Sequence, residues 1–170
     1  AQSLTKAGAD FIIIPCVSAH AFLEELQKQV NIPFIAIYDA AARTIEQTYP
    51  FIKQVGILAT SGTIQSGFFQ KRLEQSGINT IIPKKADQAR VMTCIYEIKA
   101  TSSVTGRENV RKSLLNIANR LLERRAQGII AGCTEIPLVL KSGDLNVPFF
   151  DVLLILARTA IKAAGREPIP

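Results

Sequence analysis

Residues 128–137 read Gly-Ile-Ile-Ala-Gly-Cys-Thr-Glu-Ile-Pro, an apolar run that ends at Cys133 and then becomes polar. The length and flanks of this run predict a buried strand, a tight turn and the start of a helix. Cys133 would then lie at the carboxyl end of a strand, which is where open parallel sheets bind their ligands. We expect a reactive thiol at this position.

The chain contains a second copy of this unit. Residues 9–16 read Ala-Asp-Phe-Ile-Ile-Ile-Pro-Cys, with an alanine seven positions before the cysteine and Ile-Ile at the same offsets as in residues 126–133. Asn-Ile-Pro-Phe at 31–34 matches Asn-Val-Pro-Phe at 146–149, and each is followed by Ala-Arg-Thr, at 42–44 and 157–159. A single free cysteine is usually a small buried hydrophobe. Two cysteines at equivalent strand ends instead favour chemistry at Cys16 and Cys133.

The remaining sequence alternates between strand and helix patterns. Strands are predicted at residues 11–14, 33–37, 55–59, 79–82, 128–132 and 149–150, and helices at 1–7, 19–29, 40–48, 64–75, 88–98, 108–125 and 153–164. Ser18 is predicted to cap the helix at 19–29. Such alternation is typical of parallel α/β sheets.

Tyr49-Pro50 breaks a helix and marks a crossing between two units. We therefore predict two pseudo-symmetric α/β lobes, residues 1–52 plus 149–170 and residues 53–148. Each lobe would be a parallel sheet flanked by helices, with the active site in the cleft between them. Because a helix that feeds a central strand normally follows an earlier strand, we expect the N-terminal part of the first lobe to be missing.

Composition favours a globular protein of the cytoplasm. Apolar residues make up 48% of the 170 positions and charged residues 20%. No apolar run reaches the roughly 20 residues that cross a bilayer, and no signal peptide opens the sequence, so we expect no membrane partner. The odd number of cysteines, three, is typical of a reducing compartment. Since His20 is the only histidine and no CxxC motif occurs, no metal site is predicted.

The net charge of +6 suits an anionic partner, but its basic doublets are scattered. They lie at 71–72, 84–85, 111–112 and 124–125, without interleaved aromatic residues. We interpret them as solvated helix faces and expect no nucleic-acid partner.

Two facing thiols permit inversion at a carbon acid. One thiolate would remove a proton from one face while the other thiol returns a proton to the opposite face. We expect Cys16 and Cys133 to be more thiolate-like than Cys94, which the pattern places in a helix core. Thr-Ser-Gly-Thr at 60–63 follows a predicted strand, where free backbone N–H groups would cradle a substrate carboxylate. No glycine-rich dinucleotide fingerprint or cofactor-binding lysine motif is evident, so we predict cofactor-free chemistry.

At these positions the sequence resembles the aspartate/glutamate racemase family, within the wider Asp/Glu/hydantoin racemase superfamily. Pro-Cys-Val-Ser-Ala-His at 15–20 is similar to the family's Pro-Cys-Asn-Thr-Ala-His motif, and Gly-Cys-Thr-Glu at 132–135 to its second cysteine motif. Residues 56–66 resemble its middle signature, and Ile-Tyr-Glu-Ile-Lys at 95–99 the segment that carries a lysine near the substrate. The likeness covers essentially the whole chain.

The resemblance implies a homodimeric enzyme that racemises aspartate or glutamate, a small-molecule substrate, without pyridoxal phosphate. Cys16 and Cys133 would be the two catalytic bases. The implied substrate-binding residues are Ser18, Thr60, Thr63, Lys99, Thr134 and Glu135. From charge alone, Lys99 would be a solvated helix residue and Glu135 a favourable first-turn carboxylate.

Val17 departs from the family pattern, because it replaces an asparagine expected at the substrate. Two other interpretations therefore stay open. One is another superfamily activity, such as a hydantoin racemase, a maleate isomerase or a decarboxylase. The other is a non-catalytic fragment that retains the cleft.

Overall fold

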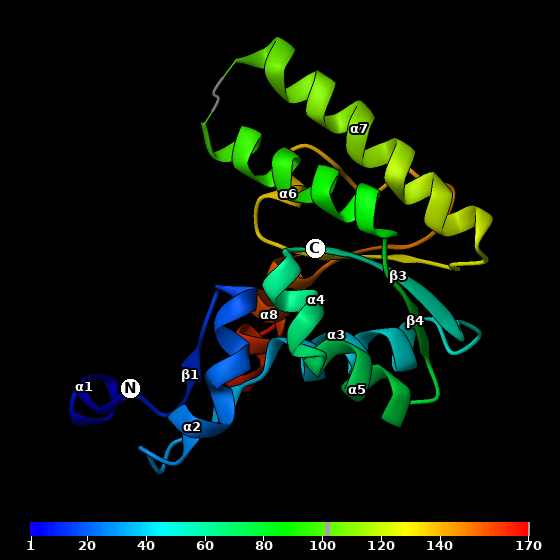
Figure 1. Cartoon of the computed structure of the whole chain (residues 1–170). Coiled ribbons are helices and arrows are strands. Elements are labelled where there is room, and N and C mark those ends of the chain that lie inside the picture. The colour runs from blue at the N-terminus through cyan, green and yellow to red at the C-terminus, as the bar shows by residue number, and fades with distance from the viewer. Residues whose placement is uncertain (101–102, 170) are drawn as a thin grey trace.

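The computed structural model describes residues 1–100 and 103–169, in which helices alternate with short strands (Figure 1). The strands are β1 (Ile12–Ile13), β2 (Phe34–Ile35), β3 (Gln54–Ala59), β4 (Asn79–Ile81), β5 (Ile129–Gly132) and β6 (Phe149–Asp151). The α-helices are α1 (Gln2–Lys6), α2 (Leu23–Gln27), α3 (Ile37–Thr48), α4 (Ser61–Ser66), α5 (Phe68–Gln75), α6 (Lys85–Ala100), α7 (Val104–Glu123) and α8 (Val152–Ala163). Two 3₁₀ segments, η1 (Val17–Phe22) and η2 (Ile136–Leu138), come after Cys16 and Cys133, which themselves follow β1 and β5.

All strand pairs described in the structure are parallel, which confirms the predicted class of fold. One sheet has the order β4-β3-β5-β6, and β1 pairs with β2 in a second sheet. In the larger sheet Ala59 is in register with Gly132. Because parallel strands end at the same edge, the residues after β3 and after β5 meet at one edge of this sheet.

Helices cover both faces of the four-stranded sheet, as Figure 1 shows, with α6 and α7 on one face and α3, α5 and α8 on the other. Successive side chains of β3 point to opposite faces of the sheet, so they enter different cores. Val55, Ile57 and Ala59 belong to the core with α3, α5 and α8, whereas Leu58 belongs to the core with α6 and α7. Strands buried on both faces read as continuous apolar runs, which is why the sequence pattern identifies them.

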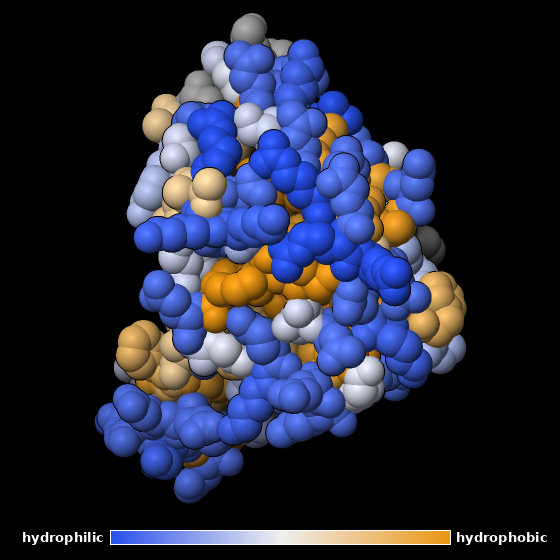
Figure 2. Space-filling model, turned by 45° about the vertical axis from the view of Figure 1, so that its right-hand side comes forward, coloured by the Kyte–Doolittle hydropathy of each residue, from blue (hydrophilic) through white to orange (hydrophobic). Residues whose placement is uncertain are grey.

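Close packing of α7 on the sheet requires Gly56. A Cβ at this position would lie 2.8 Å from Cδ1 of Ile129 and 3.0 Å from Cδ1 of Leu121. The helix therefore approaches the strand at a point where no side chain intervenes. The face in Figure 2 is mostly hydrophilic, with a band of apolar side chains visible across its middle.

Three sequence predictions about local structure are wrong. The helix expected at 64–75 is two helices, because Gly67 adopts a left-handed conformation (φ 70°) between α4 and α5. Ile37 begins α3 rather than ending a strand. Ser18 caps no helix, because it lies inside η1, whose N-cap is Cys16, and its hydroxyl bonds elsewhere.

The last helix of the chain, α8, packs on α3, which lies far from it in the sequence. β6 extends the four-stranded sheet beside β5, and α8 then packs against α3. The proposed division into two lobes stays a prediction. Among the described residues, no helix combines the length and apolar character needed to span a membrane.

Asp151 fixes the start of α8, since its carboxylate accepts hydrogen bonds from the backbone N–H groups of Leu153 (3.0 Å) and Leu154 (3.1 Å). We expect Asp151→Ala to lower the free energy of unfolding by about 1 kcal/mol, the usual value of a lost N-cap. Urea denaturation measures this change. Asp10→Ala, at an exposed position, is the control. Equal stability of the two variants would contradict the capping role.

Candidate active site

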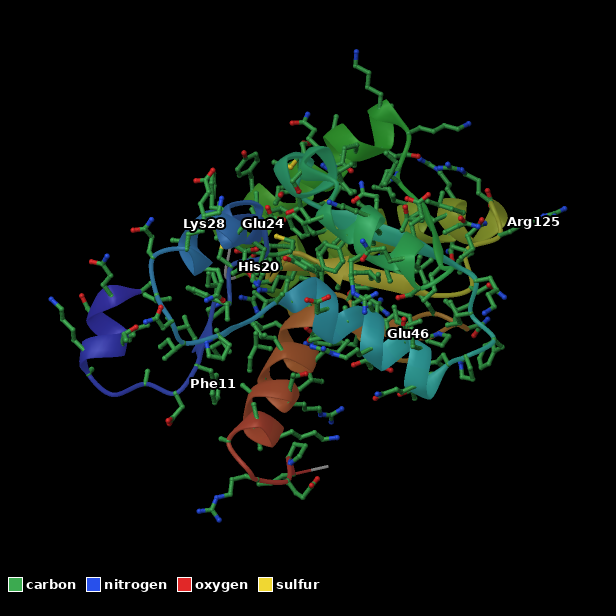
Figure 3. All side chains as sticks on the ribbon, turned by 90° about the horizontal axis from the view of Figure 1, so that it is seen from below. Phe11, His20, Glu24, Lys28, Glu46 and Arg125 are labelled. Atoms are coloured by element: carbon green, nitrogen blue, oxygen red, sulfur yellow. The ribbon has the colours of Figure 1, made fainter. Side chains whose placement is uncertain are left out.

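Cys16 lies at the turn between β1 and η1, with an exposed thiol. Nδ1 of His20 lies 3.1 Å from the Cys16 carbonyl oxygen. Because that carbonyl only accepts, Nδ1 carries the hydrogen. Burial lowers the pKa of His20, which favours the neutral ring. The imidazole, seen in Figure 3 inside the molecule near η1, therefore holds the backbone that carries the Cys16 thiol.

Cys133 occupies the corresponding place after β5, but its thiol is buried. It directly follows Gly132, whose partner Ala59 precedes Thr60. The strand register thus brings Cys133 and Thr60 to the same sheet edge.

Three hydroxyl groups form a closed cluster beside this edge. Ser18, Thr60 and Thr63 lie with each pair of oxygens 3.0 Å apart. Ser18 comes from η1, whereas the two threonines come from the start of α4, so the cluster joins segments 42 and 45 positions apart. It therefore links the turn that carries Cys16 to the end of β3.

The backbone at the start of α4 differs from the predicted anion cradle. The N–H of Thr63 donates to Oγ1 of Thr60, that of Ile64 to the Thr60 carbonyl, and that of Ser61 contacts the sulfur of Met92. Thr60 is thus the N-cap of α4, a helix of six residues. The prediction of several free N–H groups is wrong, because those of Ser61, Thr63 and Ile64 all have partners inside the protein.

Glu135 connects the second thiol to Lys99. Its Oε2 accepts hydrogen bonds from Sγ of Cys133 (2.8 Å) and Oγ1 of Thr134 (3.0 Å), while Oε1 lies 3.2 Å from Nζ of Lys99. Burial alone would raise the pKa of Glu135, but these three partners together lower it. The group is therefore a carboxylate at neutral pH.

Both cysteines act on the same ammonium group. The hydrogen bond and charge of Glu135 raise the pKa of Lys99, and electrostatic interaction with Cys133 and Cys16 contributes to the rise. Lys99 extends from the end of α6 with an exposed side chain. The structure thus brings Cys16, Cys133, Glu135 and Lys99 into one electrostatic neighbourhood.

The expected thiolate character is wrong for Cys133. Burial and the hydrogen bond to Glu135 raise its pKa to about 12, so it is a protonated thiol at neutral pH. The sequence argument relied on a helix N-terminus, but η2 has only three residues and carries little dipole. Burial also raises the pKa of Cys94, which is fully buried in α6, as predicted for a core residue.

We expect Glu135→Gln to lower the pKa of Cys133 by at least about one unit, because it removes the negative charge next to the thiol. Burial remains, so the pKa stays above its ordinary value. The pH dependence of iodoacetamide labelling, resolved by peptide mass spectrometry, measures the shift. Glu97→Gln is the matched control, since Glu97 pairs with Arg90 instead. An unchanged Cys133 profile in Glu135→Gln would contradict the assigned coupling.

The position of Val17 explains its apolar side chain. Val17 is buried and packs in the same core as Ile37 and Ile57. An asparagine here would need partners inside that core. Packing in this core thus explains a valine at the position where the family motif has asparagine.

Sequence reasoning missed two supporting residues, His20 and Gln88. His20 lies four positions after Cys16, inside the Pro-Cys-Val-Ser-Ala-His motif. This spacing is the sequence signal that could have identified it. Gln88 donates to the carbonyl of Ala59 (3.0 Å) and to Oγ of Ser61 (3.3 Å), thereby holding the end of β3. It lies 29 and 27 positions from these partners, and no local pattern indicates the contact.

These features define a parallel α/β protein with two strand-end thiols, and comparison with known proteins agrees with that class. The family model described as Asp/Glu/Hydantoin racemase matches residues 1–160. The chain belongs to this family.

The related proteins include racemases whose names state different substrate ranges. The "Broad specificity amino-acid racemase RacX" of Bacillus subtilis (strain 168) is 30% identical over 161 residues, which cover 95% of this chain and 67% of that protein. A glutamate racemase of Aquifex pyrophilus is 26% identical, over 85% of this chain and 55% of the relative. The chain therefore spans about two thirds of the first relative and about half of the second.

Solved structures show the same fold. An aspartate racemase homologue from Pyrococcus horikoshii OT3 has a TM-score of 0.84 and 29% identity, covering 97% of this chain and 71% of that one. An aspartate racemase from Picrophilus torridus has a TM-score of 0.81 and 28% identity, covering 99% of this chain and 68% of the other.

Proposed function

We propose that the protein racemises an acidic amino acid, aspartate or glutamate, by proton transfer between two thiols without a cofactor. The site would lie in a cleft between two pseudo-symmetric lobes. The observation that carries the proposal is the chain of contacts from Cys133 through Glu135 to Lys99, whose pKa Cys16 also raises. Family membership and the similarity to named racemases support the reaction type.

The two thiols would begin the reaction in different roles. Cys133 begins protonated and supplies a proton to one face of the α-carbon. Cys16 would be the base that removes the α-proton from the opposite face. The carbon–hydrogen electron pair moves onto the substrate carboxylate and returns to carbon when the new bond forms. Cys16 is then a thiol and Cys133 a thiolate, ready for the reverse direction.

Glu135 and Lys99 have opposite effects on the proton of Cys133. The carboxylate raises the pKa of the thiol, whereas the ammonium lowers it. After proton transfer, the positive charge of Lys99 would stabilise the new Cys133 thiolate. Glu135 in turn keeps Lys99 in place through the ion pair.

The hydroxyl cluster would bind a substrate carboxylate. Ser18, Thr60 and Thr63 hydrogen-bond one another, and hydroxyls rotate freely enough to redirect their hydrogens toward an anion. Thr134, which donates to Glu135, would contribute next to Cys133. Lys99 would attract the second carboxylate of an acidic substrate.

A broader substrate range is the second candidate, favoured by the similarity to the broad specificity racemase. The exposed position of Lys99 is compatible with it, because an open cation selects less strictly than a buried one. We propose a homodimer as the assembly, which light scattering tests.

The test uses each enantiomer of aspartate, glutamate, alanine and lysine in deuterium oxide without added cofactor. Loss of the α-proton signal by NMR and the appearance of the opposite enantiomer by chiral chromatography are followed together. The proposal predicts turnover of aspartate or glutamate above the other two. Equal turnover of all four favours the broad range, and no exchange with any of them would overturn the racemase function.

A further inference from the structure

A cavity lies between α3 and α8, and none of its lining residues belongs to the candidate active site. Its volume is about 510 Å³, within the usual size of small-molecule sites. α3 contributes Ala40, Arg43, Thr44, Gln47 and Thr48, α8 contributes Ile155, Arg158, Thr159 and Lys162, and the following segment adds Pro168 and Ile169. Figures 1 and 3 both show the two helices next to one another.

The lining follows the internal sequence repeat. Arg43 and Arg158 are the arginines of the two Ala-Arg-Thr copies, 115 positions apart. At the same spacing, Ala40 corresponds to Ile155, Thr44 to Thr159 and Gln47 to Lys162, and all of these line the cavity. The repeat therefore places one arginine from each copy on one groove.

The two copies also share their local hydrogen bonding. The hydroxyl of Thr44 donates to the carbonyl of Ala40 (2.9 Å), and that of Thr159 donates to the carbonyl of Ile155 (2.8 Å). Each threonine hydroxyl thus bonds to a backbone carbonyl of its own helix, four residues earlier in the chain. The arginines, which precede the threonines, remain available as donors in the groove.

The cavity is strongly basic. Arg43, Arg158 and Lys162 supply three positive charges, and none of the described lining residues is acidic. Within the described part of the chain, these three side chains make no ion pair or hydrogen bond. Glu46, labelled on α3 in Figure 3, lies 3.9 Å from Arg72 of α5 rather than lining the groove. Cations gathered without a counter-charge favour an anion between them.

We propose that this cavity, the α3–α8 groove, binds a small molecule that carries two or more negative charges, such as a phosphate monoester or a tricarboxylate. Each arginine presents a planar set of donors that matches phosphate and carboxylate oxygens. Lys162 adds a third positive charge to the lining of the groove. The apolar side chains of Ile155, Pro168 and Ile169 would contact the organic part of the ligand. The site is separate from the proposed racemisation and does not depend on it.

Isothermal titration with inorganic phosphate and, in a separate arm, with citrate tests the proposal at constant ionic strength. We expect saturable binding of at least one probe, and the stronger probe identifies the class of anion. Arg43→Gln and Arg158→Gln should each weaken that binding by about tenfold or more. Arg125→Gln changes the net charge equally and is the matched control, since Arg125 points away from both helices in Figure 3.

Conservative variants separate recognition from folding. Arg43→Lys and Arg158→Lys keep the charge but lose the planar set of donors, so they should bind with intermediate affinity. Melting temperatures without the probe show whether each variant is folded. Failure of both probes to bind, or an equal loss in Arg125→Gln and Arg43→Gln, would overturn the proposal.

Discussion

Replacing either Cys16 or Cys133 by serine is expected to lower kcat/KM for racemisation by at least about 10³-fold. Each thiol serves one face of the α-carbon, and a serine hydroxyl is a far weaker acid than a thiol. The loss should be similar for both variants, because inversion requires both faces. Chiral chromatography measures the product enantiomer.

The third cysteine provides the matched control for this experiment. Cys94 is fully buried in α6, within the core shared with α7. Cys94→Ala should retain racemisation within a few-fold while losing some stability. Retained racemisation in Cys16→Ser or Cys133→Ser would contradict the two-thiol mechanism.

Lys99→Met is expected to reduce kcat/KM by about ten- to a hundredfold. The change removes the positive charge near both thiols, so the pKa of Cys133 should rise further and that of Glu135 should also rise. A thiolate on Cys133 then becomes harder to form. Steady-state kinetics with acidic and neutral amino acids measure the effect, which should be larger for the acidic substrates.

Lys99→Arg and Lys112→Met are the controls for this prediction. The arginine retains the charge opposite Glu135 and should restore most of the activity. Lys112 is exposed on α7, outside the candidate site, so its replacement should leave kinetics unchanged. A Lys99→Met enzyme with the kinetics of Lys112→Met would rule out the proposed role of the ammonium.

The fold was predictable because its information is local. The apolar runs at β3 and β5 identify strands buried on both faces, and the repeated cysteine after an Ile-Ile pair identifies equivalent strand ends. The position of Gly67 is the exception. Its left-handed conformation divides one predicted helix into two, although the residue itself is an ordinary helix terminator.

The sequence could predict which residues belong to the candidate site, but not the hydrogen bonds and ion pairs between them. Glu135 adjoins Thr134 in the sequence, yet its pairing with Lys99 depends on where α6 ends relative to β5. Likewise, Ser18 has a local pattern typical of a helix cap, but tertiary packing brings it to Thr60 and Thr63. The high pKa of Cys133 arises from burial and a neighbouring carboxylate, which outweigh the weak dipole of a three-residue 3₁₀ segment.

Solvent deuterium exchange by the two serine variants tests the central claim most directly. Cys133→Ser retains Cys16, which can remove and return a proton on one face, so deuterium should enter one enantiomer of the substrate without inversion. Cys16→Ser should exchange only the opposite enantiomer. NMR of the α-proton, with L- and D-substrate incubated separately, measures both rates. The account predicts opposite enantiomer preferences for the two variants, and the same preference in both would contradict the assignment of one thiol to each face.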